Sequence, residues 1–190
     1  MVDGVIYISS SLNEEILDLI NELDLKTILV ETKDKDGKLP SVTIDNIKAS
    51  YEGTKHLINS GLKNLAFIGV NEENMNAWGE RYTGFVNALK DSGLEADEDL
   101  CYFKNLTVKT GYQAIQRFTE NNKSFDGIVC ASDEIAMGAI NALREKGIKV
   151  PEDVSVIGFD NNVMGSIFYP KLTTISQPSY DMGSVAVRML

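Results

Sequence analysis

The chain alternates short apolar runs of strand length with longer segments in which apolar residues recur at helical spacing. The first pair shows the pattern. Val5–Ile8 reads as a buried strand, and apolar residues then recur on one helical face from Leu12 to Leu23. The alternation continues to the end, where a last helix begins near Pro178. Strands that alternate with helices build βα units, so the pattern predicts an α/β fold around a mainly parallel sheet.

One polar stretch, from Gly69 to Ala77, interrupts this alternation. We expect it to link two small α/β lobes, the first ending near Gly69 and the second near Lys171. The final helix shows no stop signal before Leu190, and the first lobe has few strands for a doubly wound sheet. Both features predict a chain that is truncated at both ends.

The composition is that of an acidic globular protein. Acidic residues outnumber basic ones 28 to 18, and the formal charge of -10 argues against a grip on a phosphate backbone. No apolar run approaches the roughly 20 residues of a membrane span, and the opening MVDGVIYISS lacks the basic region of a signal peptide. Cys101 and Cys130 lie in apolar stretches, which favours buried thiols over a disulfide scaffold. We therefore expect a soluble cytoplasmic protein without a membrane partner.

Polar residues follow several of the predicted strands, at the edge where open parallel sheets bind ligands. Asp45 and Ser132 are also well placed as helix N-caps. Several hydrogen-bond acceptors converge there without metal-ligand spacing. The set favours a polyhydroxylated or amide-rich small molecule over catalysis, with no metal and no cofactor. The residues are Ser9 with Ser10, Glu31, Asp45, Ser132 with Asp133, and Asp160 with Asn161 and Asn162.

Arg81 is the most informative single residue. It lies about 60° around its helix from Trp78, at the margin of an apolar stripe that continues through Tyr82 and Phe85. One interpretation is an arginine whose stem covers the stripe while its charge stays in water. The other is a fixed fork of donors at the cleft between the lobes. The spacing alone does not distinguish the two.

No enzyme motif is present. The sequence lacks H-E-x-x-H, C-x-x-C, G-x-x-x-x-G-K and G-x-G-x-x-G. The only histidine, His56, lies in a predicted helix without a nearby G-x-S-x-G elbow, and we interpret it as a packed structural residue. The chain is therefore not expected to be an enzyme.

A second apolar side on the helix from Asp133 to Lys146 predicts a homodimer. Ile135 lies on the ordinary core stripe, whereas Met137 falls on the far side. The run Ile167-Phe168-Tyr169 adds an aromatic cluster in a segment that we expect to be a loop. We expect Met137 and Phe168 in the dimer interface. The alternative is that the far side packs under loops of the same lobe.

Seven segments, in chain order, resemble successive signatures of the LacI/GalR family of bacterial transcription regulators. The most specific are V-P-E-D-V-S-V-I-G-F-D from Val150 and L-T-T-I-S-Q-P from Leu172. The match runs through essentially the whole chain. The chain is similar to a catabolite-control-type member of the family. The other segments are Val2–Ile6 with Ser9-Ser10, Pro40–Val42 with Asp45-Asn46, Ala66–Gly69, Arg81–Phe85 and Ala131–Gly138.

The resemblance implies an effector-binding core of two periplasmic-binding-protein-like lobes, which are Rossmann-like and of type I. The family's chain crosses between its lobes three times, so residues 172–177 are expected to return to the first lobe. The expected domains are 1–70 with 178–190, and 71–171. The family's opening strands, helix-turn-helix and C-terminal segment have no match here. Operator DNA would therefore be bound only through a helix-turn-helix that this chain lacks.

By position, the resemblance assigns Arg81 and Asp160 to gripping the ligand and Gln177 to the return crossing. Glu31 matches an acidic residue at a strand end. Leu106 stands where an aromatic ring often stacks on the ligand, and Ser132 stands where many sugar-binding members have asparagine. Both departures count against a pyranose ligand but leave the site itself in place.

These residues together predict the effector-sensing domain of a LacI-type transcriptional repressor. A small polar ligand, sugar-like or a related metabolite, would bind between the lobes and shift the population of conformations presented to DNA. The main alternative is a periplasmic-type solute-binding protein of a sugar transporter on the same fold. A sugar hydrolase is a third, which turnover of glycosides would reveal.

Overall fold

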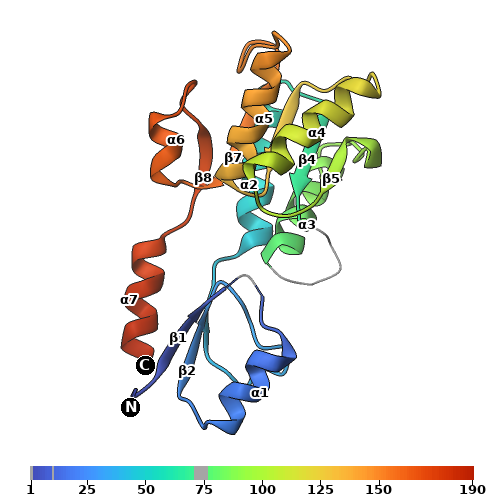
Figure 1. Ribbon diagram of the computed structural model, residues 1–190. Coiled ribbons are helices and arrows are strands. Elements are labelled where there is room, and N and C mark those ends of the chain that lie inside the picture. Colours follow the sequence, from blue (N-terminus) through green and yellow to red (C-terminus); the bar gives the residue numbers. More distant parts are fainter. Residues whose placement is uncertain (1, 10, 71–76) are drawn as a thin grey trace. The chain divides into compact units, whose positions relative to one another are not determined.

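The computed structural model describes residues 2–9, 11–70 and 77–190. The chain divides into two compact units, each with its own parallel sheet (Figure 1). Unit 1 comprises Met1–Asp45 and Pro178–Leu190, and unit 2 comprises Asn46–Gln177. Among the described residues, none of the helices is both long enough and apolar enough to cross a bilayer.

Unit 1 is built on a three-stranded parallel sheet. Its elements are β1 (Val5–Ile8), α1 (Glu14–Glu22), β2 (Thr27–Val30), β3 (Ser41–Val42) and α7 (Ser179–Met189). The strand order is β1-β2-β3, and β2 is buried along its whole length. Helix α7 packs against β2 and β3, where Met182 and Ala186 join Ile28 and Val30 in a small core.

Unit 2 is a doubly wound unit on a five-stranded parallel sheet. Its elements are α2 (Asn46–Asn59), β4 (Leu65–Gly69), α3 (Ala77–Lys90), the 3-10 helix η1 (Glu98–Leu100), β5 (Cys101–Phe103), α4 (Val108–Glu120), β6 (Gly127–Cys130), α5 (Asp133–Glu145), β7 (Ser155–Asp160), α6 (Val163–Ile167) and β8 (Thr173–Ser176). The strand order is β5-β4-β6-β7-β8. The chain therefore moves to one side of β4 first and to the other side afterwards.

This reversal of direction determines where the helices lie and where a ligand can bind. Right-handed crossovers place α3 and α4 on opposite faces of the sheet. Helix α2 packs against α3, and α5 packs against α4 (Figure 1). The order in which the chain adds strands to the sheet reverses between β4 and β6. In open α/β sheets, ligands bind beyond the carboxyl ends of the strands at this switch point.

The core of unit 2 accounts for the apolar runs of the sequence. Strands β4 and β6 are buried at every residue, as expected for central strands that are covered on both faces. Phe67, Phe85 and Phe118 are among the largest fully buried side chains. Both cysteines are buried and free, as predicted.

The predicted α/β class and parallel pairing are confirmed, with local differences. Strand β3 is short and has only the two residues Ser41 and Val42. The segment expected to be a loop before Tyr169 contains α6, whose N-cap Asn162 accepts a hydrogen bond from the Gly165 amide. His56 is exposed rather than packed, because it lies about 100° around α2 from the buried Leu57.

The observed division between the two units lies at a different place in the sequence from the predicted division between the lobes. We expected the first lobe to extend to residue 70 and the polar stretch after Gly69 to be a crossing. Instead, α2 packs on α3, and β4 pairs with β5 and β6, so residues 46–70 belong to unit 2. Residues 71–76 lie outside the described residues. Residues 172–177 also lie in unit 2, because β8 pairs with β7.

Candidate functional site

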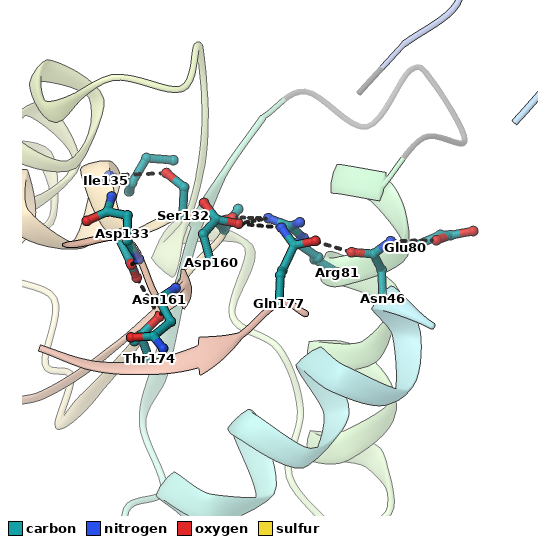
Figure 2. Close-up of polar contacts among 12 residues, drawn as sticks. Asn46, Glu80, Arg81, Ser132, Asp133, Ile135, Asp160, Asn161, Thr174 and Gln177 are labelled. Carbon is teal, nitrogen blue, oxygen red and sulfur yellow. Dashed lines mark hydrogen bonds and ion pairs between the residues drawn. The ribbon is translucent and has the colours of Figure 1, made fainter. Parts of the chain in front are cut away.

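A cluster of polar side chains lies at the carboxyl edge of the five-stranded sheet (Figure 2). It consists of Asn46 at the start of α2, Arg81 from α3, Asp160 at the end of β7 and Gln177 just after β8. The carbonyl of Ala131, which follows β6, completes it. We call these residues the Arg81 cluster. It lies beside the switch point, because the Ala131 amide donates to Ile68 of β4.

Arg81 is buried and fully engaged, with only 2% of its surface exposed. Its Nε donates to Asn46 Oδ1 at 3.0 Å, and its Nη1 donates to the Ala131 carbonyl at 2.5 Å. The guanidinium carbon lies 3.6 Å from the ring centroid of Phe159 and 4.4 Å from that of Trp78. A snorkelling arginine would hold its charge in water, so the structure favours the fixed fork of donors.

Asp160 is the negative partner of this arginine and remains open to solvent. Its Oδ1 lies 3.5 Å from Arg81 Nη1 and accepts a 2.7 Å hydrogen bond from Gln177 Nε2. One third of the Asp160 side chain is exposed, against 2% for Arg81. Asp160 is therefore partly accessible at the edge of the sheet, while its partner Arg81 is buried.

The backbone that carries Asp160 is strained. Asp160 has a φ of 110°, and Asn161 has a φ of 57°. Asparagine tolerates the left-handed region, whereas an aspartate at φ 110° costs on the order of 1–3 kcal/mol. Such backbone persists only where surrounding contacts hold it, and it is concentrated at functional sites.

Asp133 supplies contacts that hold this turn. It is the first residue of α5 and has no exposed surface. Its Oδ2 accepts from the Asn162 amide at 2.7 Å, and its Oδ1 accepts from the Thr174 hydroxyl at 2.5 Å. Burial raises the pKa of the Asp133 carboxyl, and hydrogen bonds from Thr174 and from the backbone act in the opposite direction.

Ser132 is the N-cap of α5. Its hydroxyl accepts from the Ile135 amide at 3.3 Å, and its side chain is 4% exposed. It immediately follows Ala131, so it lies next to the Arg81 cluster along the chain. The capping alternative for Ser132 is thus present in the structure, and a ligand contact by the same hydroxyl stays a prediction.

A pair of substitutions separates capping from ligand contact. Ser132→Ala and Thr107→Ala should each lower the free energy of unfolding of unit 2 by about 1 kcal/mol. Thr107 caps α4 in the same way, with its hydroxyl 3.2 Å from the Thr110 amide. Urea unfolding followed by the fluorescence of Trp78, the only tryptophan, measures both. Ligand affinity should fall for Ser132→Ala alone, and equal affinities in the two variants would leave Ser132 with capping only.

Ser9 and Glu31 lie in unit 1, one residue beyond the ends of the paired strands β1 and β2. Glu31 has a φ of 66°, and its amide donates to Val42. It lines a cavity of about 850 Å³ between these strands and α7. Its walls expose mainly apolar surface, from Ile6, Ile8, Val30, Met182 and Val187, with polar groups from Ser179, Tyr180, Ser184 and Arg188. A polyhydroxylated ligand needs several placed polar groups, so the Arg81 cluster suits it better.

The remaining predicted residues lie elsewhere in unit 2. Leu106 follows β5, at the edge strand of the sheet, and packs half-buried on the core. Met137 is only 7% exposed in the single chain. The far side of α5 is therefore covered within the chain, which removes the argument that placed Met137 in a dimer interface. Phe168 is half-buried on the core.

Comparisons with known proteins identify the family. Residues 54–190 match the periplasmic binding protein-like domain. The chain belongs to this family. Over 190 residues it is 64% identical to the HTH-type transcriptional regulator RegA of Clostridium saccharobutylicum. This match covers 100% of this chain and 57% of that protein.

Solved structures show which type of protein within the family this chain resembles. The transcription regulator CcpA of Lactococcus lactis matches with a TM-score of 0.91 at 37% identity, over 99% of this chain and 68% of that one. The CelR–cellobiose complex, also of a transcriptional regulator, matches with a TM-score of 0.90 at 29% identity, over 100% and 58%. These relatives confirm the predicted effector domain of LacI-type regulators. They are regulators, not enzymes or transport proteins.

Several residues of this site escaped the sequence reasoning. Asn46 appears in the L-P-S-V-T-I-D-N run, which was the available signal, but it was given no role in the site. Asp133 was named with Ser132 among the polar residues that follow the strands, but nothing in the sequence indicated its contacts with Asn162 and Thr174. Thr174 lies inside a strand and carries no signal. Within the described part of the chain, no group of three or more His, Cys, Asp or Glu side chains could hold a metal ion.

Proposed function

We propose that this family member senses a small polar ligand, sugar-like or a related metabolite, at the Arg81 cluster. The observation that carries the proposal is the buried arginine paired with a partly exposed aspartate at the switch point of the sheet. A carboxylate accepts hydrogen bonds from ligand hydroxyls, and Arg81 lies beside this carboxylate as its counter-ion. The cellobiose bound by a structural relative supports a sugar-like ligand.

The ligand would act by shifting a conformational equilibrium. Asn46 and Gln177 are the first and last residues of unit 2, where the chain passes to and from unit 1. Both hydrogen bond to the Arg81–Asp160 pair. A ligand that competes for or adds to these contacts would have different affinities for different hinge conformations, which is the requirement for a population shift. Operator DNA would be bound by a helix-turn-helix outside this chain, which spans about 57% of the RegA relative.

A ligand screen tests the proposed function. The 190-residue chain would be mixed with cellobiose, other saccharides, sugar phosphates and nucleobases, and stabilising compounds would be titrated by calorimetry. Asp160→Asn should weaken binding about tenfold or more, because it loses a charged hydrogen bond. Asp126→Asn is the control, since Asp126 binds the Lys63 and Asn64 amides at the opposite edge of the same sheet. Equal affinity in Asp160→Asn and wild type would overturn the proposal.

The chain would work as a homodimer. Exposed apolar side chains gather around α6, where Met164, Ile167 and Tyr169 flank the half-buried Phe168. Such a patch on a regulator is suited to a two-fold contact.

Sedimentation measures this association. The double variant Ile167→Glu with Tyr169→Glu should be monomeric at tens of micromolar, where the wild type is expected to dimerise. Val108→Glu places the same charge on an exposed apolar residue of α4 and should leave the dimer intact. A monomeric wild type, or a double variant that stays dimeric, would show that this surface does not join two chains.

A further inference from the structure

Asp133 links to each of the two amides that follow Asp160. The carboxylate binds the Asn162 amide directly through Oδ2, and it binds the Thr174 hydroxyl through Oδ1. That hydroxyl accepts in turn from the Asn161 amide at 3.3 Å. Figure 2 shows Asp133 and Thr174 on either side of Asn161. One buried side chain therefore reaches both amides of the turn, one directly and one through a relay.

Asp133 is tightly enclosed by its surroundings. A Cβ atom at Gly158 of β7 would lie 2.3 Å from Asp133 Oδ1, so β7 approaches the carboxylate closely. Asp133 itself has no exposed surface and cannot contact a ligand from solvent. Its position in the fold relates it to the ligand only through the turn that carries Asp160.

We propose that Asp133 is a positioning residue that holds the left-handed turn at 160–161 and thereby sets the direction of the Asp160 carboxylate. This inference rests on the proposed function for its meaning, because Asp160 is the proposed ligand contact. It assigns the strained φ values of Asp160 and Asn161 to a specific cause. The orientation of Asp160 then depends on the contacts of Asp133 with the following turn as well as on Arg81.

Asp133→Asn preserves shape and removes one acceptor. The new amide group must face either the Asn162 amide, where two donors would oppose each other, or the Thr174 hydroxyl, which then has to accept from the side chain instead of donating to it. Asp126→Asn is the matched control. Asp126 also accepts from two backbone amides, those of Lys63 and Asn64, at the amino ends of the strands.

Amide hydrogen exchange measures the protection of the turn amides and needs no ligand. In Asp133→Asn the amides of Asn161 and Asn162 should exchange at least tenfold faster, and the side-chain NH₂ signals of Gln177 should shift, because Gln177 binds Asp160. In Asp126→Asn all of these should match wild type. Thr174→Val removes the relay alone, so it should speed exchange at Asn161 and spare Asn162. This variant keeps the test available if Asp133→Asn does not fold. Unchanged exchange at both amides in the folded variants would overturn the proposal.

Cellobiose, or a stronger compound from the screen, then tests the consequence for binding. Asp133→Asn should weaken its affinity about tenfold in the wild-type background and less than twofold in an Asp160→Asn background. Equal losses in both backgrounds would contradict action through Asp160. If no compound binds the wild type, the proposed function fails, whereas the exchange experiment still decides the role of Asp133.

Discussion

Arg81→Met should weaken ligand binding ten- to a hundredfold and also lower the stability of unit 2. Methionine can keep the apolar contact between Trp78 and Phe159, but it donates no hydrogen bond. The Ala131 carbonyl and Asn46 Oδ1 would lose their donor, and Asp160 would lose its cation. Removing one partner of a buried ion pair costs about 3–5 kcal/mol. Because Asp160 is one-third exposed, we expect a loss of about 2–3 kcal/mol in unfolding free energy.

Arg81→Lys is the matched control for charge. It keeps a cation at this place and loses the planar fork that reaches two acceptors, so both effects should be intermediate. Urea unfolding measures stability, and calorimetry with the compound found by the screen measures affinity. If Arg81→Met bound and unfolded like the wild type, Arg81 would have neither of the two roles given to it here.

Gly138→Ala should destabilise unit 2 by about 3 kcal/mol, because it forces two tightly packed helices apart. A Cβ atom at Gly138 of α5 would lie 1.8 Å from the Val108 carbonyl oxygen of α4. The approach is reciprocal, since a Cβ atom at Gly111 of α4 would lie 1.9 Å from the Ile135 carbonyl oxygen. The obstacle in both cases is backbone, which cannot turn aside as a flexible side chain can.

Gly183→Ala provides the comparison, because Gly183 also lies in a helix but has no atom within 4 Å of its added Cβ. There the better helix propensity of alanine should stabilise unit 1 by about 0.5–1 kcal/mol. Thermal unfolding followed by circular dichroism measures both variants, and Trp78 fluorescence reports unit 2 separately. A Gly138→Ala protein as stable as wild type would mean that α4 and α5 are not packed as closely as described.

The elements of the fold were predictable because burial imposes a period on the sequence. Strand β4, covered on both faces, reads as a continuous apolar run, and α4 carries its apolar residues on one face. The division between the units was not predictable in this way. The polar stretch after Gly69 resembles a linker, whereas the true passage at Asp45 and Asn46 follows a strand and starts a helix without any change in composition.

The candidate site was predictable only in part, for a related reason. Arg81, Asp160 and Gln177 were identified from their motifs, and the structure brings them together. Periodicity placed Met137 on a second apolar side of its helix, but periodicity cannot show that this side is buried within the same chain. Asp133 contacts Asn162, which follows β7, and Thr174 of β8. Both are far away in the sequence, so only tertiary structure could show these contacts.

We propose that the ligand binds at the Arg81 cluster rather than in the apolar cavity of unit 1. A nuclear magnetic resonance titration of the chain with cellobiose, or with the strongest compound from the screen, tests it most directly. We predict that the Nε–H signal of Arg81 and the side-chain NH₂ signals of Asn46 and Gln177 shift with a common saturation curve. Shifts confined to Ile6, Val30 and Val187, with those three polar signals unmoved, would contradict the claim.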